Sequence, residues 1–244
     1  MNLSHLTEAE LKEALLLLEK QDGYAVQDKC QGSFLDYVNH MWPEFICGRH
    51  HQIFAEKLEQ VAKGEIKRLI VNMPPRHTKS EFASTYFPSW MMGQNPKMKI
   101  MQTTHTGELA VRFGRKVRNL MAQKEYKQVF PDVSLQADNK SAGRWETNKG
   151  GEYFAAGVGG AVTGRGADLL IIDDPHSEQD ALSPTALESA YEWYTSGPRQ
   201  RLQPKGSIVL VMTRWSTIDL TAKLLQSQKE PLADQWEVIE FPAI

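Results

Sequence analysis

Apolar residues beyond position 67 come in short, nearly continuous runs separated by longer stretches of mixed character. The runs are RLIVNM (68–73), KIMQTT (99–104), YFAAGV (153–158), DLLIID (168–173) and SIVLVMT (207–213), and WEVIEFPAI (236–244) follows them. A strand that is covered on both faces needs apolar side chains on both. Continuous rather than alternating runs therefore predict buried strands.

The stretches between these runs carry helix signals. Helices are expected around 79–87, 106–123, 184–195 and 217–228, with Thr106, Ser183 and Ser216 as N-caps. No internal repeat or low-complexity linker divides the chain. Strands that alternate with helices predict an α/β fold with a mainly parallel central sheet flanked by helices.

The first part of the chain has the spacing of helices. Thr7 followed by Glu10 has the form of a capping box. Apolar residues then recur at helical spacing, at Leu11, Leu15 and Leu18, and Gly23 is expected to stop this helix. A second helix is expected from His51 to Lys63, where Gly64 follows as its end signal.

Charge and cysteine content narrow the class of protein. A formal net charge of -2 and a pI near 6.4 give no overall attraction to polyanions, so a contact with nucleic acid needs a local basic surface. Cys30 and Cys47 form no CxxC pair, which fits a reducing cytoplasm and two buried thiols. No apolar stretch reaches the length of a membrane span, and no signal peptide opens the sequence.

A candidate phosphate-binding loop follows the first apolar run, because RLIVNM leads into PPRHTKS and then into a predicted helix, EFASTYF. A strand, a loop, a Lys-Ser pair and a helix in this order are what phosphate binding requires. Loop N–H groups would hold the β- and γ-phosphates of ATP, Lys79 would add a point charge, and the Ser80 hydroxyl would ligate Mg2+.

The loop departs from the pattern G-x-x-x-x-G-K-[ST], because Met73 and Thr78 stand where that pattern has glycines. Two prolines follow Met73 and have no N–H to donate. Anion binding therefore falls on the amides of the next five residues and on the Arg76 guanidinium. The expected nucleotide-binding residues are Arg76, His77, Thr78, Lys79 and Ser80. The alternative is a proline-rich loop that simply enters a helix.

Polar residues also close two later runs. Ligands of open α/β sheets bind at the carboxyl ends of strands, where Asp173 is expected to hold Mg2+ and Asp174 to orient or activate the attacking water. The run SIVLVMTRW ends in Thr213, which is placed to sense the γ-phosphate and to signal its loss. In both places the alternative is a residue that only caps the strand or the turn.

Taken together, these motifs resemble the ATPase domain of the large terminase subunit, the DNA-packaging motor of tailed bacteriophages. The resemblance covers nearly the whole chain: HHQIFAEKLEQV, RLIVNMPPRHTKSEFAS, KIMQTTHTGELAVRFGRKVR, GGAVTGRGADLLIIDDP and SIVLVMTRWSTIDL. It implies a P-loop NTPase fold of the ASCE type, with residues 1–48 as an N-terminal helical lid and 49–244 as the ATPase core. The C-terminal nuclease domain of that family has no counterpart here, so no DNA cleavage is expected.

The resemblance also implies roles for single residues. PPRHTKS is similar to the family's Walker A loop, in which a glycine usually takes the place of Thr78, LLIIDD is similar to Walker B, and VMTRW to the coupling motif that contains Thr213. Gln52 matches by position the glutamine that recognises adenine, unless it is an ordinary exposed helix residue. Arg165 is similar to the arginine that reaches a neighbouring subunit's nucleotide in trans, with Arg76 as the cis alternative and an ordinary loop arginine as the other.

The function implied is ATP hydrolysis, with bound Mg2+, that drives double-stranded viral DNA into a procapsid. Implied partners are a portal protein, a small terminase subunit and further copies in a ring, in the host bacterial cytoplasm and without membrane contact. One alternative is a helicase-like translocase. The other is a non-catalytic nucleotide-binding assembly module, which is favoured by Thr78 in the loop and by Asp174 in place of a glutamate. One predicted helix has a basic face that consists of Arg112, Arg115, Lys116 and Arg118. This face either contacts DNA phosphates or is an ordinary solvated surface.

Overall fold

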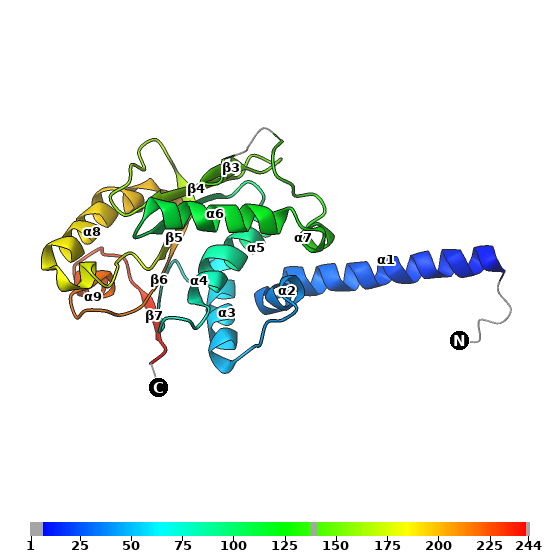
Figure 1. Cartoon of the computed structure of the whole chain (residues 1–244), viewed down its shortest axis with the longest axis horizontal. Helices are drawn as coiled ribbons and strands as arrows, with labels where there is room; N and C mark the ends of the chain where they lie inside the picture. The colour runs from blue at the N-terminus through cyan, green and yellow to red at the C-terminus, as the bar shows by residue number, and fades with distance from the viewer. Residues whose placement is uncertain (1–6, 138–140, 243–244) are drawn as a thin grey trace.

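A seven-stranded sheet forms the centre of the molecule (Figure 1). The computed structural model describes residues 7–137 and 141–242, without the side chains of 8–10, 13–15 and 17–19. The strands are β1 (Arg68–Asn72), β2 (Lys99–Thr104), β3 (Arg144–Glu146), β4 (Glu152–Gly157), β5 (Ala167–Asp173), β6 (Leu202–Met212) and β7 (Glu237–Glu240). Their order is β3-β4-β2-β5-β6-β1-β7, and every neighbouring pair is parallel except β3 with β4. This architecture confirms the predicted α/β fold with a mainly parallel sheet.

Helices cover both faces of this sheet. They are α1 (Glu8–Gly32), α2 (Phe34–Met41), α3 (Arg49–Ala62), α4 (Lys79–Glu81), α5 (Phe87–Gln94), α6 (Gly107–Met121), α7 (Lys124–Val129), α8 (Pro184–Ser196) and α9 (Leu220–Ser227). A π-helical turn, Phe82–Tyr86, joins α4 to α5 without a break. Core residues of α2, α3, α5, α6 and α7 pack on one face of the sheet, and those of α8 and α9 pack on the other.

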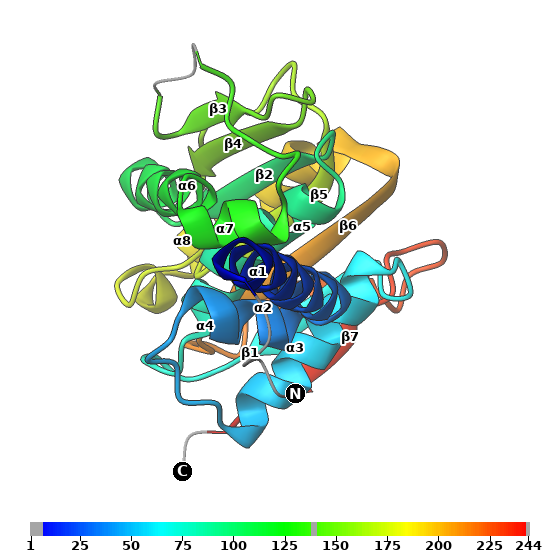
Figure 2. The same cartoon turned by 90° about the vertical axis from the view of Figure 1, so that its right-hand side faces the viewer.

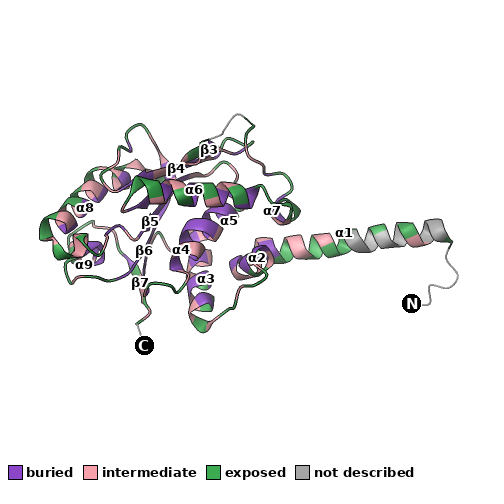
Figure 3. Ribbon diagram, in the orientation of Figure 1, coloured by how far each residue is buried: buried purple, intermediate pink, exposed green. Residues whose placement is uncertain are grey.

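The strands are buried on both faces, as their continuous apolar runs predict. Along β5, Leu169 and Ile171 belong to the core on the α3 and α6 side, whereas Leu170 and Ile172 belong to the core on the α8 and α9 side. Successive strand residues point to opposite faces, so each apolar run feeds two cores at once. Figure 3 shows the central strands in the colour of buried residues.

The N-terminal helix departs from prediction. Instead of stopping at Gly23, α1 runs 25 residues to Gly32 and projects from the body of the molecule (Figures 1 and 2). One glycine inside a helix costs only about 1 kcal/mol relative to alanine. The residues beyond it pack against the body, where Cys30 is buried and Gln31 Nε2 donates to Val129 O at 2.7 Å. Helix α1 ends where Ser33 caps α2 by accepting from Asp36 N.

Of the three N-caps predicted between the strands, two are confirmed, whereas the Glu10 side chain of the predicted capping box lies outside the described residues. Thr106 accepts from Leu109 N at the start of α6, and Ser183 accepts from Ala186 N at the start of α8. Ser216 is wrong, because the chain turns for three more residues and Asp219 caps α9 by accepting from Ala222 N. An aspartate carboxylate satisfies a free helix amide at least as well as a serine hydroxyl.

Other differences from prediction are smaller. Cys30 is buried as expected, and burial raises the pKa of its thiol to about 11, but Cys47 is exposed. The last strand covers only Glu237–Glu240, and residues 243–244 of the predicted run lie outside the described residues. Three short elements were not predicted: α2, α7 and β3. Within the described part of the chain, no helix has the length and apolar character needed to cross a bilayer.

Candidate nucleotide-binding site

The predicted motifs meet because of the strand order. Strand β6 lies between β1 and β5, with Asn72 opposite Met212 and Asp173 opposite Val211. All three strands are parallel, so the segments that follow them leave the sheet at the same edge. The loop after β1, the aspartates that end β5 and Thr213 after β6 are therefore neighbours in space.

The loop after β1 contains two non-glycine residues with left-handed backbone. Arg76 has a φ of 65° and Thr78 a φ of 64°. Left-handed backbone costs an L-residue about 1–2 kcal/mol, and a β-branched side chain is especially unsuited to it. Thr78 occupies the position before the lysine, where the resemblance leads us to expect glycine. The backbone therefore keeps a turn suited to glycine although the side chain is threonine.

Lys79 is the centre of the site. Its side chain is only 6% exposed, and Nζ lies 2.8 Å from Asp174 Oδ2 and donates to Thr213 Oγ1 at 3.1 Å. Thr213 closes the cluster from the other side, because its N–H donates to Asp174 Oδ1 at 2.8 Å. One side chain from each of the three motifs thus takes part in a single network.

Asp173 lies beneath this network and is 1% exposed. Ser80 Oγ donates to its Oδ1 at 2.9 Å, and Ser84 Oγ donates to its Oδ2 at 2.7 Å. Burial, together with the charge of Asp174, raises the pKa of Asp173 to about 7, although both serine hydroxyls and the Lys79 charge act in the opposite direction. The carboxylate is therefore held close to its titration point at neutral pH.

Ser84 and Gln102 were not foreseen from the sequence. Both are fully buried, and Gln102 Nε2 donates to Ser84 Oγ at 3.0 Å, so β2 fixes the hydroxyl that fixes Asp173. Ser80 and Ser84 are four residues apart, and the π-helical turn begins between them. Single π-turns inside helices occur frequently at functional sites. This turn, which is visible only in the structure, therefore points to Ser84 as a functional residue.

The oxygen atoms of Ser80 and Asp173 suit a small hard cation such as Mg2+, which prefers one or two carboxylates together with substrate phosphate and water. Ser80 Oγ and Asp173 Oδ1 are neighbours, 2.9 Å apart. Among the described residues no group of three or more His, Cys, Asp or Glu forms a metal cluster. The donor set fits an ion completed by phosphate rather than one held by protein alone.

A cavity of about 640 Å³ adjoins the loop after β1. Its lining residues come from the ends of three neighbouring strands and are Asn72, Met73, Pro74, Pro75, Thr213, Arg214, Glu240, Phe241 and Pro242. Small-molecule sites commonly have volumes of about 300–1,000 Å³ and mostly apolar walls. Gln52, the residue expected to recognise adenine, is exposed on α3 and does not line this cavity.

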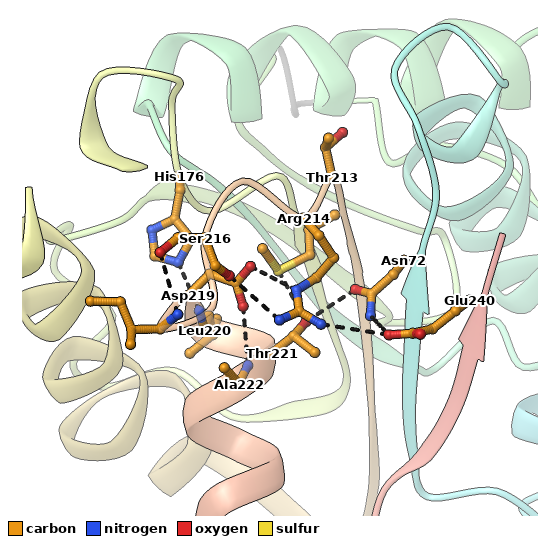
Figure 4. Close-up of polar contacts among 12 residues, drawn as sticks. Asn72, His176, Thr213, Arg214, Ser216, Asp219, Leu220, Thr221, Ala222 and Glu240 are labelled. Atoms are coloured by element: carbon orange, nitrogen blue, oxygen red, sulfur yellow. Dashed lines mark hydrogen bonds and ion pairs between the residues drawn. The ribbon is translucent and has the colours of Figure 1, made fainter. Parts of the chain in front are cut away.

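Arg214 forms the polar wall of this cavity and is held on several sides (Figure 4). Its Nε donates to Asp219 Oδ2 at 2.7 Å, and its guanidinium lies 3.5 Å from Glu240 Oε1. Asn72 Nδ2 also donates to Glu240 Oε1, at 3.1 Å. The network ties the residue after Thr213 to α9, β1 and β7, so the end of β6 is fixed to three further elements.

The remaining predicted residues lie away from this cluster. Arg165 precedes β5, at the opposite end of that strand from Asp173, where its guanidinium lies 3.0 Å from Glu152 Oε1 and stacks over Phe154. Arg76 and His77 are exposed on the loop after β1. On the basic face of α6, Lys116 pairs with Glu81, whereas Arg112 and Arg115 are exposed.

Comparisons with known proteins bear on the fold. No protein-family model and no curated protein sequence matches the chain. The crystal structure of the large terminase of bacteriophage HK97 superposes with a TM-score of 0.54 over 82% of this chain and 41% of its own, at 11% identity. The large terminase of a thermophilic bacteriophage in complex with ADP gives a TM-score of 0.46 over 76% of this chain and 44% of its own, also at 11% identity. The chain thus shares the fold of the HK97 protein and spans less than half of that protein's length.

Proposed function

We propose that this chain is the ATPase domain of a large terminase subunit, which hydrolyses ATP to drive double-stranded DNA into a viral procapsid. The carrying observation is the contact network of Lys79 with Asp174 and Thr213, above the contact of Ser80 with Asp173. These residues come from separate motifs. A Lys-Ser loop, two strand-end aspartates and a strand-end threonine thus supply one connected set of side chains.

The proposed binding step begins with Lys79. A buried ammonium ion needs a negative partner, and Asp174 fills that role here at 2.8 Å. Triphosphate oxygens that enter the loop would compete with Asp174 for Lys79, aided by the amides of residues 76–80. Asp174 is then free to accept a hydrogen bond from the attacking water, and Thr213, which contacts both residues, senses the exchange.

Ser80 and Asp173 would hold Mg2+, which supplies charge neutralisation at the β- and γ-phosphates. The nucleoside would occupy the cavity of about 640 Å³ beside Pro74 and Pro75. A ring of copies would bring Arg165, or the loop residue Arg76, to the transition state. Portal protein, small terminase subunit and DNA are the partners that this function requires.

Steady-state phosphate release from MgATP tests the proposal. Lys79→Ala is expected to lower kcat by about a hundredfold or more, because it removes a charge aimed at the transferring phosphate. Lys67→Ala is the matched control, since Lys67 is exposed before the opposite end of β1. Turnover of the unaltered protein no greater than that of Lys79→Ala, with and without DNA, would refute the enzyme. Retained nucleotide binding in that case would favour the non-catalytic assembly module.

A further inference from the structure

His51 contacts the phosphate loop from outside the strand-end cluster. It lies in the first turn of α3, beside the exposed Gln52, and is 6% exposed. Its ring packs against Phe45 and Phe82, with centroid distances of 4.8 and 5.1 Å. The imidazole is therefore fixed in position by aromatic neighbours before any hydrogen bond is considered.

The hydrogen bonds of His51 run in one direction. Gly48 N–H donates to His51 Nδ1 at 2.9 Å, and a backbone amide can only donate, so the ring proton is on Nε2. Nε2 lies 2.5 Å from Thr78 Oγ1 and donates to it. The Thr78 hydroxyl in turn donates to His77 O at 2.5 Å. Three consecutive bonds thus connect the start of α3 to the phosphate loop.

The neutral state of the ring agrees with this direction. Burial lowers the pKa of His51 to about 4, and the charges of His50 and His77, the titratable groups that face it, act in the same direction. A proton on Nδ1 would also oppose the Gly48 N–H. His51 is therefore a neutral Nε2 donor over the pH range in which nucleotides are usually assayed.

We propose that His51 is a positioning residue for the phosphate loop, and that its hydrogen bond holds Thr78 in the left-handed turn that a glycine would adopt unaided. The inference rests on the proposed nucleotide-binding function. Strained backbone persists only where the surroundings fix it. The Thr78 hydroxyl accepts the hydrogen bond from His51, and a glycine has no such group. Without this bond, relaxation of Thr78 would move the Thr78 amide and the neighbouring loop amides away from the positions in which they would hold phosphate.

The first test compares KM and kcat for ATP. His51→Phe keeps the aromatic packing and lacks the donor, and Thr78→Val keeps the β-branched shape and lacks the acceptor. Each is expected to raise KM about tenfold, the effect of losing one hydrogen bond that leaves its partner unpaired. The value of kcat should stay within about twofold, because loop amides hold ground state and transition state alike. A packing role alone would leave Thr78→Val unaffected.

The second test is a double-mutant cycle. If the two side chains act through one bond, His51→Phe with Thr78→Val raises KM no further than either change alone. In a Thr78→Gly background, glycine adopts the left-handed backbone without a hydrogen bond from His51, so adding His51→Phe should leave KM unchanged. A tenfold rise on adding His51→Phe to Thr78→Gly would overturn the proposal. Circular dichroism confirms folding, and if His51→Phe does not fold, an unchanged KM in Thr78→Val overturns it instead.

Failure of this inference differs from failure of the proposed function. If the unaltered protein binds and hydrolyses ATP above the Lys79→Ala level while His51→Phe and Thr78→Val behave normally, only the role of His51 is refuted. If the unaltered protein neither binds nor hydrolyses ATP above that level, the nucleotide site itself is refuted.

Discussion

Removal of the Ser84 hydroxyl tests whether the buried serine supports Asp173. Ser84 donates to the carboxylate at 2.7 Å and accepts from Gln102 at 3.0 Å, and all three side chains are buried. A hydrogen bond to a charged group contributes about 1.5–3 kcal/mol, against about 0.5–1.5 kcal/mol for a neutral one. Ser84→Ala should therefore lower the free energy of unfolding by about 2–3 kcal/mol at pH 8.

Ser89→Ala is a matched control, because Ser89 is a fully buried serine that follows in α5 and has only neutral partners. It donates to Tyr86 O at 2.7 Å and lies 2.7 Å from the Tyr37 hydroxyl. Its loss should cost about 1 kcal/mol. Urea unfolding followed by tryptophan fluorescence measures both variants, and the midpoint with its slope gives the free energy.

The dependence on pH gives Ser84→Ala a further signature. The Ser84 hydrogen bond lowers the pKa of Asp173, so its loss raises that pKa above about 7. The folded variant then retains a proton that the folded parent releases, and its stability falls further as pH rises. The cost of Ser84→Ala should be greater at pH 8 than at pH 5, whereas that of Ser89→Ala should not change.

The same substitution should weaken Mg2+ use if Asp173 is the metal carboxylate. Losing an outer partner of a metal ligand typically costs about 10–100-fold in metal affinity, so the Mg2+ concentration for half-maximal turnover should rise about tenfold in Ser84→Ala and stay unchanged in Ser89→Ala. Equal stability losses for both variants at both pH values, with unchanged Mg2+ dependence, would refute a special role for Ser84.

Three further predictions concern other parts of the chain. Asp173→Asn should be more stable than the parent in urea at pH 8, and this advantage should shrink toward pH 5. The pKa of the Asp173 carboxylate is raised to about 7 in the folded state, so at pH 8 folding must bury a charge that asparagine does not carry. Equal stability of the two proteins at pH 8 contradicts this reasoning. Inactive Arg165→Ala protein mixed with Asp174→Asn protein should regain turnover if the arginine acts in trans, and no rescue where rings form counts against it. Gly114→Ala should lower the free energy of unfolding by about 1–3 kcal/mol, because the added Cβ would collide with the backbone oxygen of Ala142. Gly23→Ala should raise helix stability by up to about 1 kcal/mol, because no atom lies within 4 Å of its added Cβ. Thermal unfolding measures both changes.

Residues that close apolar strands were predictable from the sequence. Lys79, Ser80, Asp173 and Thr213 follow or end such runs, and parallel strands deliver their carboxyl ends to one edge, so a shared site was expected. Ser84 and Gln102 carry no such signal. They lie inside a helix and a strand, and only the packing of one element on the other gives their polar groups a purpose.

The contrast between Gln52 and His51 shows that position in the sequence does not tell which of two neighbouring helix residues points inward. Adenine recognition was predicted for Gln52, which is the neighbour of His51 in α3. Successive helix residues are rotated by about 100°, so one of the two faces the loop after β1 while the other faces solvent. Gln52 is exposed and His51 is buried against Thr78. Which of them turns inward depends on how α3 packs, and that packing involves aromatic residues from other segments.

The sequence by itself determined the alternation of strands and helices and the chemistry at the strand ends, because both follow from local periodicity and from the residues that interrupt it. Only the tertiary structure decided that β6 lies between β1 and β5, which brings Thr213 to Lys79. It also decided the burial that raises the pKa of Asp173 and the contact that accompanies left-handed Thr78. Strand order, burial and hydrogen-bond partners depend on residues far apart in the chain, and local patterns carry no information about those distances.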